Sequence, residues 1–254
     1  MWLLTTNRAE LQFFVSSDAV PGRYAILSHR WGPKEESFQD LQAIHKQCEA
    51  TGENPRDLVS PKIRNSCVLA EEHGYQWVWI DTCCIDKTSS AEISEAINSM
   101  FNYYTLSGIC YVYLEDVPSK CILTEPGSPF RRSKWHTRGW TLQELIAPRL
   151  VLFVSKSWDP LGFKSELASL LEEITHVPVA ILRQERMLSR FSIAQRMSWA
   201  ATRETTRLED EAYCLLGLFN INMPTLYGEG IKADRKSTRL NSSHSGESRM
   251  PSSA

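Results

Sequence analysis

The amino-acid sequence predicts an α/β fold in which a parallel sheet is flanked by helices and followed by a helical C-terminal extension. Two observations support this prediction. Apolar runs at residues 24–28, 76–80, 109–114 and 150–154 are nearly continuous, as in strands that are buried on both faces. Helical patterns separate the first three runs, and alternation of strands with helices is typical of a parallel sheet.

The ends of the helices between these strands are visible in the sequence. Ser60 is suited to an N-cap and Pro61 to the first position of a helix, and Gly74 is placed to end it. Ser89 and Glu92 have the spacing of a capping box at the start of the next helix. The long stretch 161–218 has mostly helical patterning, which predicts the C-terminal extension.

Composition places the chain among ordinary soluble proteins. It has 254 residues, with 28 basic and 30 acidic side chains, so it carries no electrostatic signal for nucleic acid. No apolar run is long enough to span a bilayer. The seven cysteines are irregularly spaced without a C-x-x-C pair, and the histidines show no ligand spacing, so we expect no metal site. Free thiols favour a reducing, cytoplasmic location.

The last 21 residues, 234–254, differ from the rest of the chain. They contain seven serines and no aromatic residue, and four basic side chains follow the aspartate that opens the segment. Such a segment buries too little apolar surface to offset its ordering entropy. We expect 234–254 to be a disordered tail of non-native, vector-like sequence, and residues 1–233 to form the domain.

Polar residues follow three of the predicted strands, at 28–31, 81–84 and 115–116. Ligands of open parallel sheets bind beyond the carboxyl ends of the strands, so these segments predict a binding site. The alternative is that they only mark where each strand leaves the core. The candidate ligand-binding residues in them are Ser28, Arg30, Trp31, Asp81 and Cys83.

A second candidate lies in a predicted helix at residues 142–147, which Pro148 ends. Trp140 and Glu144 are four positions apart and so share a helical face. A carboxylate beside an indole is partly shielded from water, which raises its pKa and strengthens its action on a nearby cation. The alternative is a surface carboxylate packed near a structural tryptophan.

Other segments support weaker hypotheses. Cys83 or Cys84 beside His29 has the residue types of a nucleophile and base, although a structural role is the simpler interpretation. Residues 202–207 are rich in charges of both signs, which predicts salt-bridged helix ends and loop contacts. Residues 227–230 are predicted to form a turn.

Three long motifs carry a family resemblance. Residues 24–32 (YAILSHRWG), 79–86 (WIDTCCID) and 138–148 (RGWTLQELIAP) closely resemble the fungal heterokaryon incompatibility (HET) domain family. The resemblance covers residues 1–233. It implies a cytoplasmic protein of fungal non-self recognition, or vegetative incompatibility, whose effector domain triggers programmed cell death in response to a partner that the sequence does not identify.

The HET family is in turn similar to Toll/interleukin-receptor (TIR) domains, which have a flavodoxin-like parallel sheet. In the enzymatic TIR members a Trp-x-x-x-Glu-Leu helix supplies the glutamate that cleaves NAD, and Trp140 and Glu144 match this pattern. The resemblance thus implies an NAD glycohydrolase that uses Glu144 and no cofactor, with NAD as substrate. Trp31 or Trp140 would stack on a ring, Arg30 would pair with a phosphate, and Asp81 would bind a ribose hydroxyl.

Two alternatives remain open at this point. TIR-like domains also act without catalysis, as signalling modules that self-associate through their surfaces. The third hypothesis is a cysteine-dependent hydrolase that uses Cys83 or Cys84.

Overall fold

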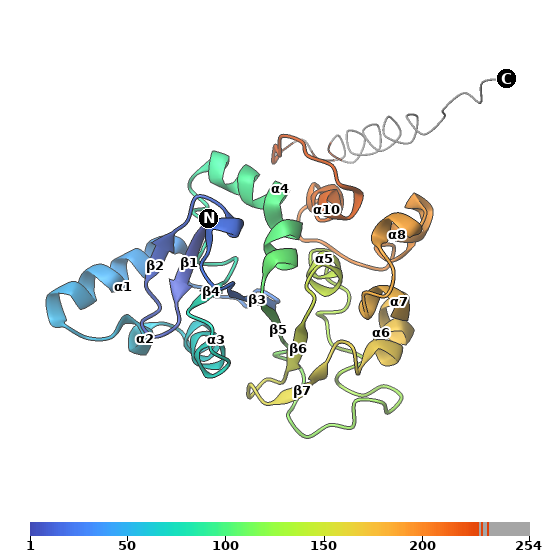
Figure 1. Ribbon diagram of the computed structural model, residues 1–254, viewed down its shortest axis with the longest axis horizontal. Helices are drawn as coiled ribbons and strands as arrows, with labels where there is room; N and C mark the ends of the chain where they lie inside the picture. The colour runs from blue at the N-terminus through green and yellow to red at the C-terminus, as the bar shows by residue number, and fades with distance from the viewer. Residues whose placement is uncertain (229, 231–232, 234–254) are drawn as a thin grey trace.

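In the part of the chain that the structure describes, seven strands form one sheet, in the order β2-β1-β4-β3-β5-β6-β7 (Figure 1). The structure is a computed structural model that describes residues 1–228, 230 and 233, so the predicted tail at 234–254 lies outside the described residues. The strands are β1 (Trp2–Thr5), β2 (Leu11–Phe13), β3 (Ala25–His29), β4 (Trp77–Trp79), β5 (Ile109–Tyr113), β6 (Val151–Val154) and β7 (Pro160–Phe163).

The sheet is mixed, which corrects the prediction of a parallel sheet. The four central strands β4, β3, β5 and β6 are parallel, and they are the four strands that the sequence predicts. The outer strands β1, β2 and β7 pair antiparallel with their neighbours. Short connections join β1 to β2 and β6 to β7, and a short connection permits only antiparallel pairing. Strand β7 also lies in the region that the sequence assigns to helix.

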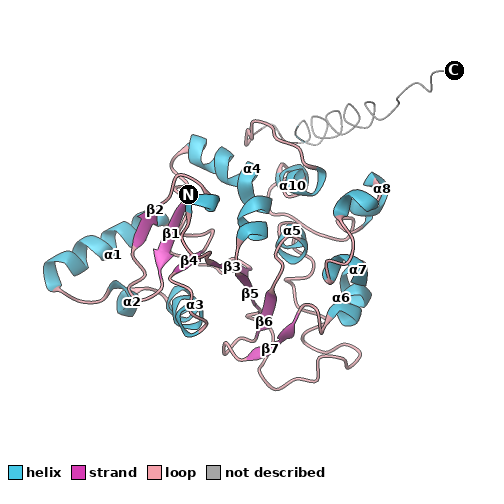
Figure 2. Ribbon diagram, in the orientation of Figure 1, coloured by secondary structure: helices cyan, strands magenta, loops and turns pink. Residues whose placement is uncertain are grey.

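Helices cover both faces of the sheet (Figure 2). In Figure 1, α4, α5 and α10 gather on one side of the sheet and α3 lies on the other. The helices are α1 (Phe38–Thr51), α2 (Pro55–Leu58), α3 (Pro61–Glu72), α4 (Ser90–Leu106), α5 (Thr141–Ile146), α6 (Ala168–Thr175), α7 (Val179–Leu182), α8 (Ile193–Ser198), α9 (Asp210–Tyr213) and α10 (Leu216–Phe219).

The predicted helix starts are confirmed in position and corrected in detail. Ser60 precedes α3 and Pro61 opens it, but the Ser60 side chain makes no capping hydrogen bond. Ser89 caps α4 by accepting from the backbone N–H of Glu92 at 3.3 Å. The Glu92 carboxylate accepts from the backbone N–H of Asp86 at 3.0 Å, so the second half of the capping box does not form.

The order of the parallel strands creates a switch point at the centre of the sheet. The chain leaves β3 for β4 on one side and then returns to β5 on the other, so β3 lies between them. Ligands of α/β proteins bind at the carboxyl ends of strands on either side of such a point. The carboxyl ends of β3 and β5 carry the sequence-predicted segments 28–31 and 115–116. In the described part of the chain, no helix is long and apolar enough to cross a membrane.

Candidate functional site

The carboxyl end of β3 and the short helix α5 bring Ser28 and Glu144 into contact. Ser28 lies next to last in β3 and is fully buried between the sheet and α5. Its hydroxyl donates a hydrogen bond to Oε2 of Glu144. The indole Nε1 of Trp135 in turn donates to the Ser28 hydroxyl oxygen at 2.8 Å. Two residues that were predicted from separate motifs therefore form one buried polar network.

Glu144 is buried, with 8% of its surface exposed. Burial raises its pKa to about 8, and the charge of Asp81 adds to that rise. The hydrogen bond from Ser28 and the nearby guanidinium groups of Arg138 and Arg203 act in the opposite direction. The carboxyl is therefore largely protonated at neutral pH, and a cationic ligand would favour its ionised form. The alternative of a surface carboxylate is wrong for this residue.

Glu144 faces a cavity of about 450 Å³ at the carboxyl ends of the central strands. This volume lies within the range of about 300–1,000 Å³ that small-molecule sites occupy. Four of the seven predicted site residues line it: Trp31, Asp81, Trp140 and Glu144. Its other lining residues are His29, Ile85, Lys87, Ile93, Ala96, Ile97, Met100, Arg138, Thr141, Thr206, Arg207, Asp210 and Tyr227.

The indole ring of Trp31 lies at this cavity and is contacted both at its edge and on one face. Its indole Nε1 donates to Oδ2 of Asp81 at 2.7 Å. The ammonium of Lys87 lies 4.1 Å from the centre of the ring, a cation–π distance. The side chain nevertheless remains 51% exposed, so part of the ring is open to a ligand.

His29 lies on the cavity wall between two carboxylates. Its Nδ1 is 3.8 Å from Asp81 Oδ1 and its Nε2 is 3.9 Å from Glu35 Oε2, both too long for direct hydrogen bonds. The pKa of His29 is lowered to about 3, mainly by burial and to a smaller extent by the charge of Lys62. The ring is therefore neutral at physiological pH. Both of its nitrogens are buried without a hydrogen-bond partner in the described chain.

Part of the cavity wall comes from the C-terminal segment, which the sequence analysis did not assign to the site. Residues 202–207 contribute Thr206 and Arg207, while Asp210 and Tyr227 follow from beyond them. Loop contacts in this segment were predicted correctly, but no described charged side chain of 202–207 forms a salt bridge. The arginine and acidic residues clustered in this segment were a signal in the sequence. No local pattern, however, indicated that the segment folds against the cavity.

Backbone pairing attaches this segment to the start of α5. Glu204 N–H donates to Thr137 O at 2.7 Å, and Gly139 N–H donates to Glu204 O at 2.8 Å. Arg203 strengthens the junction, because its Nη1 donates to Thr141 Oγ1 at 2.8 Å and to Arg138 O at 2.9 Å. The C-terminal segment therefore holds the residues that precede Glu144.

Three predicted ligand-binding residues do not line the cavity: Ser28, which is fully buried behind Glu144, and Arg30 and Cys83. The guanidinium of Arg30 lies 3.6 Å from Glu115 at the neighbouring strand end. Cys83 is fully buried, and burial raises its pKa well above the ordinary value, with Cys84 raising it further. Such a thiol is a weak nucleophile, which disfavours the hydrolase hypothesis. Among the described residues, no group of three His, Cys, Asp or Glu side chains is placed to hold a metal ion.

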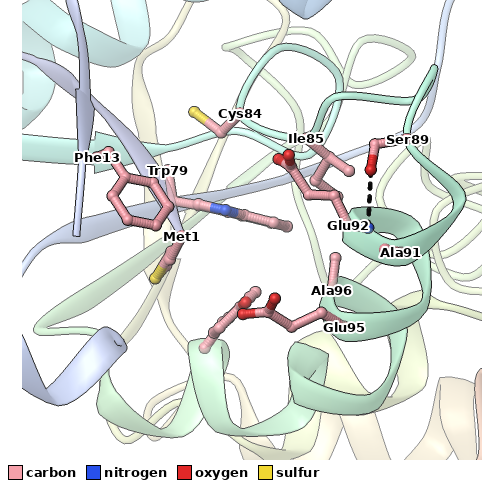
Figure 3. Close-up of a pocket in the computed structure, with 11 residues that line it drawn as sticks. Met1, Phe13, Trp79, Cys84, Ile85, Ser89, Ala91, Glu92, Glu95 and Ala96 are labelled. Atoms are coloured by element: carbon pink, nitrogen blue, oxygen red, sulfur yellow. Dashed lines mark hydrogen bonds between the residues drawn. The ribbon is translucent and has the colours of Figure 1, made fainter. Parts of the chain in front are cut away.

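A second cavity, of about 240 Å³, lies between the N-terminal strands and the first half of α4 (Figure 3). Figure 3 shows Trp79, Cys84 and the carboxylates of Glu92 and Glu95 around it. None of the predicted site residues lines this cavity. The candidate site is therefore the larger cavity with Glu144.

Fold and site together define an α/β domain with a buried carboxyl group at the switch point of its sheet. Residues 24–123 match the family model described as Heterokaryon incompatibility protein (HET). Vegetative incompatibility protein HET-E-1 of Podospora anserina is 45% identical over 214 residues, which cover 82% of this chain and 15% of that relative. The chain therefore belongs to the heterokaryon incompatibility (HET) domain family.

The match to the Podospora relative covers only part of that protein. The chain spans about 15% of the length of the curated relative that it matches. No solved structure matches the chain. The TIR-like and flavodoxin-like relationship therefore stays a prediction.

Proposed function

We propose that this domain is an effector of heterokaryon incompatibility that cleaves the nicotinamide–ribose bond of NAD, with Glu144 as the catalytic residue, and so triggers cell death in the cytoplasm. The observation that carries this proposal is the position of Glu144. It is a buried carboxyl that Ser28 holds in place on the wall of a cavity with the volume of a small-molecule site. The incompatibility role rests on the family and on the name of the Podospora relative.

The chemistry needs a carboxylate where positive charge develops. The bond between the nicotinamide nitrogen and ribose C1′ breaks, and its electron pair stays with the nicotinamide, which leaves as a neutral molecule. Positive charge then spreads over the ribose as in an oxocarbenium ion, and the ionised Glu144 stabilises it at short range. Water adds to C1′ and releases a proton, which completes the hydrolysis to ADP-ribose and nicotinamide.

Other cavity residues suit the remaining parts of such a substrate. Trp31 and Trp140 supply aromatic surface for a planar ring, and Asp81 supplies carboxylate oxygens for a hydroxyl. Burial raises the pKa of Glu144 to about 8, and the cationic nicotinamide ring of a bound substrate would favour the ionised carboxylate that the reaction needs.

The test is release of nicotinamide from NAD by the purified full chain. Glu144→Gln keeps the size of the side chain and is expected to lower the rate by about 100-fold or more, the scale of losing one group that stabilises developing charge. Glu115→Gln is the matched control, because Glu115 lies at a neighbouring strand end but not on the cavity. Wild-type protein at high concentration that leaves NAD intact would contradict the proposal.

A second function is supported by a different surface. Several apolar side chains near the C-terminal helices are exposed, including Met187 at 76%, Leu208 at 60% and Met197 at 42%. A self-associating signalling module, without catalysis, would bury exposed apolar side chains such as these. In that case Glu144→Ala retains killing activity in fungal cells, and Met187→Ser with Met197→Ser abolishes both self-association and killing.

A further inference from the structure

The charged groups of the Glu144 cavity differ in how well the protein itself satisfies them. Its three carboxyl side chains each have a protein partner. Asp81 accepts from Trp31 at 2.7 Å, Glu144 accepts from Ser28, and Asp210 accepts from the Tyr227 hydroxyl at 2.9 Å. Each acid therefore has a partner within the protein, and Oδ1 of Asp81 is buried without a hydrogen bond in the described chain.

The two cavity arginines are much less engaged. Nη1 of Arg138 donates to Thr206 Oγ1 at 2.6 Å, and this is the one hydrogen bond of that guanidinium to a described residue. The Arg207 guanidinium stacks over the Tyr227 ring at 4.4 Å and makes no hydrogen bond within the described part of the chain. Neither arginine has a carboxylate within 4.0 Å in that part. Their remaining N–H groups are free to bind an anion.

Both arginines line the cavity, and they come from neighbouring backbone segments. Arg138 lies just before α5, and Arg207 follows Thr206, to which Arg138 is hydrogen-bonded. The bridge between Arg138 and Glu204 fixes the two backbone segments side by side. Two planar guanidinium groups from adjacent segments suit the several oxygens of a diphosphate, which arginine binds through paired N–H groups.

Other walls of the same cavity match the rest of a nucleotide. Ile93, Ile97 and Met100 of α4 give it an apolar side, and the exposed Trp31 ring supplies an aromatic surface. Lys87, over that ring, adds a third cation.

We propose that Arg138 and Arg207 form a diphosphate subsite, so that the ligand of the cavity is a nucleoside diphosphate or a dinucleotide built on one. This inference deepens the proposed function, since it names the part of NAD that the C-terminal segment holds. It assigns a binding role to residues 206–207, outside the 24–123 region that matches the family model.

The experiment is calorimetric titration of the full chain with ADP and with adenosine, neither of which can undergo the proposed cleavage. Wild-type protein is expected to bind ADP at least tenfold more tightly than adenosine. Arg207→Gln should weaken ADP binding by about tenfold, the scale of one charge-assisted contact, and leave adenosine binding unchanged. Because the Arg207 side chain is exposed, this variant should fold normally. Arg138→Gln provides the second test.

Arg186→Gln is the matched control, since Arg186 is exposed and lies away from the cavity. ADP binding no tighter than adenosine binding, or ADP binding that neither arginine variant weakens, would overturn the diphosphate subsite. The outcome is separate from that of the proposed function. If the protein binds ADP but releases no nicotinamide from NAD, the diphosphate subsite stands and the proposed catalysis is wrong. If it releases nicotinamide but does not prefer ADP to adenosine, the catalysis stands and the subsite is wrong.

Discussion

Trp135 donates its indole N–H to the hydroxyl oxygen of Ser28 over 2.8 Å, and this bond determines where the serine proton points. An indole nitrogen can only donate, so Ser28 must accept from it. The serine's own proton is then available to Glu144, to which it is donated. Trp135 and Ser28 therefore act as positioning residues that favour the ionised form of Glu144, against the burial that raises its pKa.

Replacing Ser28 should shift the pH dependence of NAD cleavage upward. If Glu144 acts as a carboxylate, the rate rises with pH with a midpoint near its pKa of about 8. Ser28→Ala removes a hydrogen bond to the charged form, which contributes about 1.5–3 kcal/mol, so the midpoint should rise by about one pH unit or more. Trp135→Phe should cause a smaller shift in the same direction.

The measurement is a profile of nicotinamide release between pH 6 and pH 10. Ser157→Ala, at an exposed serine, is the control and should leave the midpoint unchanged. A Ser28→Ala variant that loses rate equally at every pH would mean that Ser28 has only a structural role.

The buried carboxyl should also make the stability of the fold depend on pH. Glu144 has an ordinary pKa of 4.5 when unfolded and about 8 when folded. Between these values the unfolded chain loses the proton while the folded chain keeps it. The free energy of unfolding therefore falls as pH rises, by up to about 1.4 kcal/mol for each pH unit.

Glu144→Gln cannot ionise, so its stability relative to wild type should increase from pH 5 to pH 8 and stay constant above that range. Urea unfolding at several pH values checks this without any substrate. Glu115→Gln, at a partly exposed side chain, should show no such trend. If the difference between Glu144→Gln and wild type stays the same from pH 5 to pH 8, then the pKa of Glu144 is not raised by burial.

Gly139 is predicted to tolerate no side chain, because the C-terminal segment packs directly against it. A Cβ at this position would lie 2.5 Å from Thr205 Cγ2 and 3.2 Å from Cys214 Sγ. Gly139→Ala should therefore cost about 1–3 kcal/mol of stability by overpacking. Gly32→Ala is the control, since its Cβ would meet Glu35 at an ordinary 3.4 Å. Urea unfolding of both variants tests this prediction. Equal stabilities would show that the C-terminal segment moves away from residue 139 at little cost in free energy.

The sequence was a good guide where the signal is local. The parallel strands follow from their continuous apolar runs, and the starts of α3 and α4 follow from Ser60, Pro61 and Ser89. Glu144 was found because its spacing from Trp140 matches a family motif. The edge strand β7 was missed, because four residues between a tight turn and a helix carry no distinctive period.

The rest of the site could not be predicted because it depends on contacts between distant segments. Arg207 lines the cavity from a segment in which residue 204 pairs with residues 137–139 across more than 60 positions, and Tyr227 comes from farther along the chain. Arg30 was predicted to face the site from its position after β3, but it turns to Glu115 instead. Side-chain direction after a strand end is set by neighbouring loops, which local patterns do not encode.

Lys164 is predicted to stabilise the helix that carries Glu144. It is 2% exposed, and its ammonium donates to Leu145 O at 3.0 Å and to Pro148 O at 2.6 Å. Pro148 prevents α5 from continuing, so the carbonyl groups at its end need another donor. Lys164→Met keeps the apolar stem but leaves Leu145 O without its donor, while Pro148 O keeps Nε2 of Gln184 as a donor at 3.1 Å, so the change should cost about 1–3 kcal/mol. Lys156→Met, at an exposed lysine, should change stability by less than about 0.5 kcal/mol.

Urea unfolding measures both lysine variants, and the position of Lys164 adds a second expectation. Because α5 ends where this ammonium binds, loosening it should also disturb the contact between Glu144 and Ser28. Lys164→Met should therefore reduce nicotinamide release under conditions in which the protein is still folded, as judged by circular dichroism. A variant that loses stability but keeps the wild-type rate would mean that Lys164 supports the fold and that Glu144 is held by β3 alone.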